Sequence, residues 1–211
     1  DLTFDIAKNE WVFISAPSGA GKTTLLKLLY FGTRASAGEV IVDGIPLTHM
    51  RRNRVPQLRR TCGVIFQDYK LIPGRTVFEN VALVLEAAGC ERRLISKKVR
   101  AVLHMVGMEG HADTLPLRLS GGEQQRAAVA RAIVGDPKII LADEPTGSLD
   151  EESARAVLAL LQAAHIRGAT VIIATHDKGM IRSIGGRVLY LNQGRLYAAG
   201  HIEKRYDRMV L

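Results

Sequence analysis

The chain has 211 residues, 47% hydrophobic and 24% charged, which predicts one large folded domain, or a core with an inserted subdomain, and argues against disorder. No apolar run approaches the ~18–20 residues of a membrane span, and Cys62 and Cys90 are too few for a disulfide framework and lack metal-ligand spacing. The net charge of +8 favours anionic partners, but with 5% aromatic residues, single-stranded nucleic acid binding is weakly supported and no nucleic acid partner is expected.

The first predicted unit is a strand, a loop of small residues and a helix. Residues 10–15 read as a buried strand, and a helix starting near Lys22 places several leucines inward. The intervening run, Ala16 to Thr23, fits the phosphate-loop pattern G-x-x-x-x-G-K-[ST] except that Ala replaces the first Gly. Gly19 and Gly21 let backbone N–H groups turn toward one point, and the helix adds its positive end. The pattern assigns Lys22 to the β- and γ-phosphates and Thr23 to Mg²⁺.

Two further strands are predicted at residues 38–43 and 61–67, the second ending at Gln67. Gln67 is a candidate Mg²⁺ ligand and sensor of the γ-phosphate, and the alternative is a polar surface amide. The stretch between these strands carries the densest basic cluster of the chain. It reads either as a solvated face or as a surface attracted to anionic lipid headgroups. Its members are Arg51, Arg52, Arg54, Arg59 and Arg60.

Residues 75–134 lack strand patterns and are predicted to form a helical subdomain inserted in the sheet. Thr76 and Glu79 have the spacing of a capping box at a helix start, and so do Ser120 and Glu123. Gly89 is the expected stop of the first of these helices. A basic helix is expected between them, at about residues 95–106.

Strands resume at residues 138–142 and 170–175, and a helix with apolar residues at helical spacing lies between them, from 151 to about 165. This alternation predicts an α/β fold with a parallel sheet. Asp143 and Glu144 follow the first of these strands. Asp143 is placed to hold Mg²⁺, and Glu144 to activate or orient a water molecule as general base. His176 follows the second strand, at the edge where α/β sites lie.

The chain resembles the ATP-binding cassette (ABC) ATPases over essentially its whole length. The resemblance rests on six motifs in family order: the phosphate loop, Gln67, the run LSGGEQQR at residues 119–126, the pair Asp143-Glu144, the run Ser148-Leu149-Asp150, and His176. It implies a single nucleotide-binding domain over residues 1–211, of the phosphate-loop NTPase type. The expected core is a mixed, mainly parallel sheet with an antiparallel β edge and the inserted helical subdomain.

The resemblance also implies an ATP-hydrolysing enzyme that works as a head-to-tail homodimer. Lys22, Gln67, Glu144 and His176 are then the catalytic set, and Thr23, Gln67 and Asp143 hold Mg²⁺. ATP is bound by the phosphate loop of one subunit and by two parts of the other, the signature run (residues 119–126) and Asp150. Asp150 is alternatively a plain helix N-cap, and both roles are compatible. The implied ATP-binding residues are Ser18, Gly19, Ala20, Gly21, Lys22, Thr23, Thr24, Ser120, Gly121, Gly122, Glu123 and Asp150.

Family members usually stack adenine on an aromatic residue before the phosphate loop. We expect Phe4 on the strand that follows that position, and the stacking residue in a segment preceding Asp1. No residue of the chain is assigned this contact.

Within the family, residues 54–68 (RVPQLRRTCGVIFQD), 75–81 (RTVFENV) and 141–147 (LADEPTG) are most similar to the bacterial cell-division branch. That branch implies a cytoplasmic protein, peripheral on the inner face of the membrane and paired with an integral membrane protein. The alternative is the ATPase of a lipoprotein-release or macrolide-export complex. A soluble DNA-repair ATPase is disfavoured because no heptad run is present, and a ribosomal one because there is one cassette. A binding module without turnover is disfavoured by the intact catalytic set.

Overall fold

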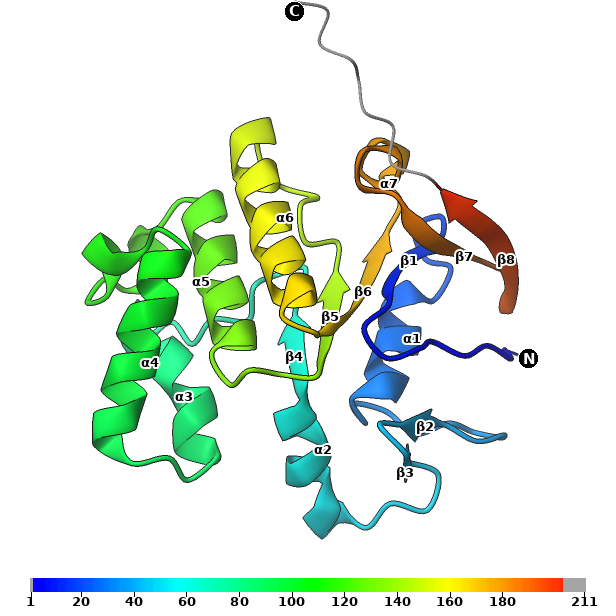
Figure 1. Cartoon of the computed structure of the whole chain (residues 1–211), viewed down its shortest axis with the longest axis horizontal. Helices are drawn as coiled ribbons and strands as arrows, with labels where there is room; N and C mark the ends of the chain where they lie inside the picture. Colours follow the sequence, from blue (N-terminus) through cyan, green and yellow to red (C-terminus); the bar gives the residue numbers. More distant parts are fainter. Residues whose placement is uncertain (1, 203–211) are drawn as a thin grey trace, which may run out of the picture.

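The computed structural model describes residues 2–202, which form a six-stranded sheet in the order β4-β5-β6-β1-β7-β8 (Figure 1). Neighbouring strands from β4 to β7 pair in parallel, and β8 pairs antiparallel with β7. The carboxyl ends of the parallel strands therefore open at one edge of the sheet, where ligands bind in such folds. The strands are β4 (Cys62–Ile65), β5 (Ile139–Asp143), β6 (Thr170–Thr175), β1 (Trp11–Ser15), β7 (Gly186–Asn192) and β8 (Arg195–Ile202).

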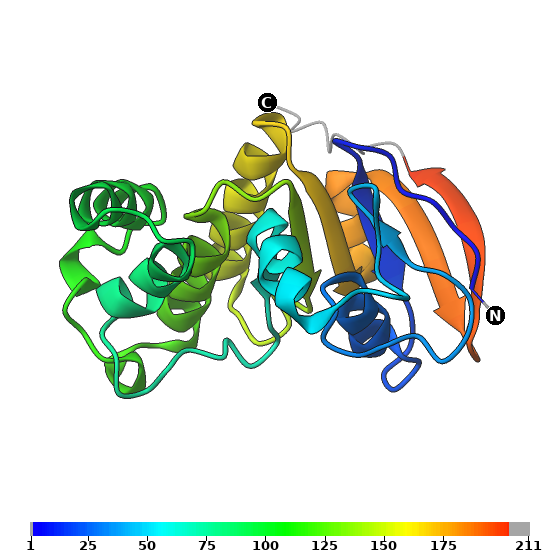
Figure 2. The same ribbon diagram turned by 90° about the horizontal axis from the view of Figure 1, so that it is seen from below.

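Helices cover both faces of the sheet, so the central strands β1 and β6 are buried along their whole length and are mostly apolar. In β1, Phe13 belongs to the core on the side of α5 (Gly121–Ile133), α6 (Glu151–Ile166) and α7 (Lys178–Ile184), whereas Ile14 packs against α1 (Lys22–Leu29). The alternation follows from the two-residue period of a strand. Figure 2 shows α1 and α6 on opposite sides of the sheet.

The predicted strands between residues 38 and 67 are shorter than expected. β2 (Ile41–Val42) and β3 (Ile45–Pro46) form a separate antiparallel pair, and β4 begins only at Cys62. The residues before β4 form a 3₁₀ turn, η1 (Arg52–Arg54), and the helix α2 (Val55–Thr61), which the sequence analysis did not predict. Leu58 of α2 is fully buried against Val42, Leu47 and Met50, and this small core fixes the helix.

Two of the five arginines of the basic cluster bind backbone carbonyls of neighbouring segments. Arg59 donates to the carbonyl of Phe31 at 3.2 Å, and Arg60 donates to the carbonyl of Ala87 at 2.9 Å. Arg51, Arg52 and Arg54 are exposed.

Residues 77–133 contain helices and no strand, and they form a lobe beyond β4 (Figure 1). Both predicted capping boxes are confirmed: Thr76 with Glu79 opens α3, and Ser120 with Glu123 opens α5. The elements of the lobe are α3 (Val77–Ala87), α4 (Arg92–Met105), η2 (Glu109–His111), η3 (Pro116–Arg118) and α5 (Gly121–Ile133).

The C-terminal strands β7 and β8 were not predicted from the sequence. They place two more strands beside β1, and β8 is the antiparallel edge that the family resemblance implies. Across residues 2–202 we find no helix with the length and apolar character that a membrane crossing requires.

Candidate active site

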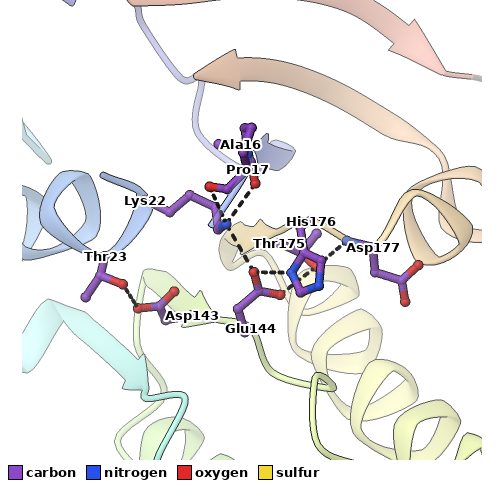
Figure 3. A network of polar contacts seen from close by, with 9 residues as sticks. All are labelled: Ala16, Pro17, Lys22, Thr23, Asp143, Glu144, Thr175, His176 and Asp177. Carbon is purple, nitrogen blue, oxygen red and sulfur yellow. Dashed lines mark hydrogen bonds and ion pairs between the residues drawn. The ribbon is translucent and has the colours of Figure 1, made fainter. Parts of the chain in front are cut away.

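The sheet register brings the predicted motifs together at one edge. Ser15, at the end of β1, lies opposite Thr175 at the end of β6, and Asp143, at the end of β5, lies opposite Ala174. The phosphate loop, the Asp143-Glu144 pair and His176 each begin where one of these strands ends, so the register alone makes them neighbours (Figure 3).

The loop between β1 and α1 has the backbone of an anion-binding turn. Gly19 and Gly21 have φ angles of 77° and 100°, which side-chain-bearing residues rarely adopt. Gly21 is the N-cap of α1 and offers no side-chain hydrogen bond, and the first helical turn contains no acidic residue. The free N–H groups and the positive end of α1 are therefore available to a phosphate.

Lys22 is almost completely buried at the base of this loop. Its Nζ donates to the carbonyl of Ala16 at 2.8 Å and lies 3.3 Å from Oε1 of Glu144 (Figure 3). Both side chains of this ion pair are only 8% exposed. The ammonium group is thus held beside the phosphate loop by acceptors that a nucleotide phosphate can replace.

Glu144 is the centre of the polar network. Its backbone is left-handed, with a φ of 46°, and its N–H donates to the carbonyl of Ala174 at 2.8 Å. Oε1 lies 2.7 Å from Nδ1 of His176, and Oε2 accepts from the hydroxyl of Thr175 at 3.0 Å. The carboxylate is therefore oriented by two side chains from the end of β6 and by Lys22, as a general base requires.

Thr23 and Asp143 fit a divalent cation. The hydroxyl of Thr23 donates to Oδ2 of Asp143 at 2.6 Å, whereas Oδ1 of Asp143 is buried without a hydrogen-bond partner among the described residues. Burial raises the pKa of this carboxyl, against the opposing effect of the Thr23 hydrogen bond. A buried carboxylate oxygen without a partner beside a threonine hydroxyl and a phosphate loop suits Mg²⁺, directly or through water.

Gln67 lies beyond the end of β4, at the same edge of the sheet, but it is exposed. No side-chain hydrogen bond or ion pair within residues 2–202 joins it to Lys22, Thr23, Asp143 or Glu144. The following residues, Tyr69 and Lys70, carry their backbone in the left-handed region.

The signature residues lie on the helical lobe. No hydrogen bond or ion pair among the described residues joins residues 119–126 to the phosphate loop. The Ser120 hydroxyl donates to Oε2 of Glu123 at 2.9 Å, and the same Glu123 oxygen accepts from the Ser120 N–H at 2.8 Å. The hydrogen bond from the Ser120 N–H lowers the pKa of Glu123 most, and the bond from the Ser120 hydroxyl lowers it further. The structure therefore assigns Glu123 to the helix cap.

Asp150 is the predicted N-cap of α6, and its Oδ1 accepts from the N–H of Ser153 at 2.9 Å. Ser153 in turn abuts the signature: a Cβ added at Gly122 would lie 2.5 Å from its hydroxyl oxygen. A larger residue at position 122 would therefore require Ser153 to shift. This close approach places the Asp150 loop against the start of α5.

Two residues of the network were missed by the sequence analysis. Thr175 holds Glu144, and the only sequence signal for it is its position directly before His176. Gln125, which is 1% exposed, donates from Nε2 to the carbonyl of Pro145 at 2.8 Å and so attaches the loop after Glu144 to α5. It lies inside the signature run, but its partner is distant in sequence.

The expectation that Phe4 lies on a strand is wrong. Residues 2–7 form no strand, and Phe4 packs, half-buried, against the core that contains Ile14 and Leu26. The adenine contact has no assigned residue.

The comparisons with known proteins agree with this geometry. Residues 1–147 match the profile of the ABC transporter family. Curated relatives named cell division ATP-binding protein FtsE are 44% identical in Mycobacterium tuberculosis (93% of this chain, 85% of the relative) and 43% identical in Escherichia coli K12 (95% and 90%). The dimeric post-hydrolysis state of the ATP-binding cassette MJ0796 bound to ADP and Pi superposes with a TM-score of 0.88 at 34% identity, covering 98% of this chain and 90% of that one. The chain belongs to the ABC transporter family and is an ATP-binding cassette ATPase, with FtsE proteins among its relatives.

Proposed function

We propose that this chain is the ATPase subunit of a membrane complex that acts in bacterial cell division. The observation that carries the proposal is the convergence of Lys22 and His176 on Glu144 beside an anion-binding loop, in a chain that is 41–44% identical to FtsE proteins over 92–95% of its length. The ATPase chemistry follows from the site, and the cellular role follows from the relatives.

The roles of the site residues follow from their contacts. The backbone of residues 18–24 holds the phosphates of ATP, and Lys22 moves from the Ala16 carbonyl and Glu144 to the β- and γ-phosphates. Thr23 and Asp143 hold Mg²⁺, with Gln67 as a further ligand once its segment closes on the nucleotide. When bound, the ion neutralises charge that builds up on the phosphate oxygens.

Glu144 accepts the proton of the attacking water, and Thr175 fixes the orientation of its carboxylate. His176 donates to the γ-phosphate and holds Glu144 in place.

We further propose a head-to-tail dimer in which the ATP of one subunit is closed over by Ser120, Gly121 and Gly122 of the other. The solved relative is dimeric, and Ser120 is exposed at a helix N-terminus in this chain. The helical subdomain at residues 75–134 then carries the second half of each site. A serine and two glycines present bare N–H groups to the γ-phosphate, and Asp150 contacts the opposite subunit.

The dimer is tested with Ser120→Arg. This change should prevent ATP-driven dimerisation, measured by sedimentation, and leave ATP binding by the monomer unchanged. Ser36→Arg adds the same charge at an exposed loop position and serves as the control. A stable ATP-bound dimer of Ser120→Arg would contradict the arrangement.

We propose that the membrane partner resembles FtsX, and that the chain is cytoplasmic and peripheral on the inner face of the membrane. ATP-driven closure then transmits a conformational signal to cell-wall hydrolases at the division site. The test is purification of tagged Glu144→Gln from membranes solubilised with ATP, followed by identification of the bound protein. An FtsX-like protein supports the proposal, and recovery with ribosomes or DNA alone would overturn it.

The second candidate is the ATPase of a lipoprotein-release or macrolide-export complex. It is favoured by the family profile, which is that of ABC transporters, and by the 34% identity to a cassette described as a bacterial ABC transporter cassette. Copurification of an exporter permease in the same experiment would select it.

A further inference from the structure

The segment after Gln67 contains two adjacent residues in the left-handed conformation. Tyr69 and Lys70 have φ angles of 59° and 50°. Single Gly or Asn residues adopt this region readily, but a tyrosine followed by a lysine does so only where the surrounding structure holds it. Local bonds close the turn, since the N–H of Tyr69 donates to the carbonyl of Phe66 at 3.1 Å and Lys70 pairs with the exposed Asp68. The carbonyls of Tyr69 and Lys70 are held from elsewhere in the fold.

Arg131, in the last turn of α5, holds both residues. Its Nη1 donates to the carbonyl of Lys70 at 2.5 Å, and its Nη2 donates to the carbonyl of Tyr69 at 2.6 Å. No acidic side chain within residues 2–202 forms an ion pair with Arg131. Burial lowers the pKa of its guanidinium. The fork of the guanidinium matches two neighbouring carbonyls, which a lysine cannot bridge in the same way.

The side chain of Tyr69 reaches the other end of the same helix. Its hydroxyl lies 3.0 Å from the hydroxyl oxygen of Ser148, and a Cβ added at Gly121 would lie 3.2 Å from it. Gly121 follows the signature serine, and Ser148 lies two residues before the N-cap of α6. Tyr69 is therefore in contact with the start of α5 while its carbonyl is bound to Arg131 near the end of α5.

We infer that Arg131 is a positioning residue, which fixes the left-handed turn at Tyr69-Lys70. It thereby joins the Gln67 segment (residues 67–70) to the start of α5 at residues 120–122 and to the loop at residues 148–150. A shift of the Gln67 segment toward a bound nucleotide then moves α5 with it. Ser120 and Asp150 are presented to the partner subunit only when the Gln67 segment has the matching position. The inference rests on the proposed function, because the dimer roles of Ser120 and Asp150 are proposals.

The inference predicts that Arg131 controls closure and turnover and has little effect on the first binding of ATP. In Arg131→Lys, kcat and the affinity of ATP-driven dimerisation should each fall on the order of tenfold, whereas the ATP affinity of the monomer stays within about twofold. The matched control is Arg155→Lys on α6, where the arginine is exposed and pairs with Glu151. The three quantities are measured on the full chain, with the melting temperature of each variant.

A second substitution separates positioning from plain packing. Glycine adopts a positive φ without strain, so Lys70→Gly in the Arg131→Lys background should restore much of kcat and dimerisation. Tyr69→Phe, which removes only the hydroxyl bond to Ser148, should lower dimer affinity without lowering the melting temperature.

The outcomes distinguish failure of the Arg131 inference from failure of the proposed function. Wild-type kcat and dimerisation in Arg131→Lys would overturn the inference, and so would a loss that tracks the melting temperature and is not rescued by Lys70→Gly. Lys22→Ala and Ser120→Arg are measured in parallel. If Lys22→Ala still hydrolyses ATP, or Ser120→Arg still dimerises, the proposed function fails instead.

Discussion

Replacing Glu144 by Gln tests the proposed chemistry directly. The amide has nearly the same shape as the carboxylate and can still accept from Thr175, so the loop after β5 should keep its position. What disappears is the negative charge that lies 3.3 Å from Nζ of Lys22 and 2.7 Å from Nδ1 of His176. The variant therefore removes a proton acceptor and a competitor for Lys22 at once.

The substitution should slow hydrolysis, whereas it should leave ATP binding equal or stronger. Loss of a general base lowers kcat by about 10²–10⁴, or roughly 3–5 kcal/mol in the barrier. The Lys22–Glu144 attraction is about 5 kcal/mol before desolvation is subtracted, at an effective dielectric constant near 20. ATP must displace this contact in the wild-type chain, so the variant should bind ATP at least as tightly and accumulate as an ATP-bound dimer.

The assay combines single-turnover hydrolysis with sedimentation in the presence of ATP. Glu152→Gln, at an exposed position on α6, is the matched control for the loss of one carboxylate. Turnover within a few-fold of wild type would place the base elsewhere and refute the role of Glu144. Weaker ATP binding would refute the competition for Lys22.

Three further changes test the site and its support. Lys22→Ala should weaken ATP binding by about 2–5 kcal/mol in calorimetry, and normal affinity would contradict the phosphate assignment. Because burial raises the folded-state pKa of Asp143, the stability from this group is present below its unfolded pKa and is lost as the pH rises through the folded pKa. Asp143→Asn should thus melt higher than wild type at neutral pH without Mg²⁺, and the difference should vanish in acid. Equal melting temperatures at neutral pH would show that burial of the Asp143 carboxylate does not destabilise the fold. Gly63→Ala drives a Cβ into the backbone carbonyl of Ala132 and should cost about 2–3 kcal/mol, or roughly 4–12 °C of melting temperature, whereas Gly110→Ala, which has open space, should not.

Local chemistry made several elements predictable. The capping boxes at Thr76 and Ser120 were correct because each depends on residues three positions apart. The buried strands β5 and β6 were found within a residue or so, because a strand covered on both faces is a continuous apolar run. The helix α2 was missed because Pro56 and the arginines obscure its pattern, and Leu58 is its one fully buried residue.

The sequence by itself determined the chemistry of the chain: a phosphate loop with Lys22 and Thr23, two carboxylates and a histidine at strand ends, and helix starts set by nearby side chains. These features are encoded in residues a few positions apart, where backbone geometry leaves few alternatives. The tertiary structure alone decided which groups meet. Thr175 and Glu144 are 31 positions apart, Gln125 and Pro145 are 20 apart, and Arg131 and Tyr69 are 62 apart. Such contacts depend on the strand order and on how α5 packs against the sheet, which no local pattern specifies.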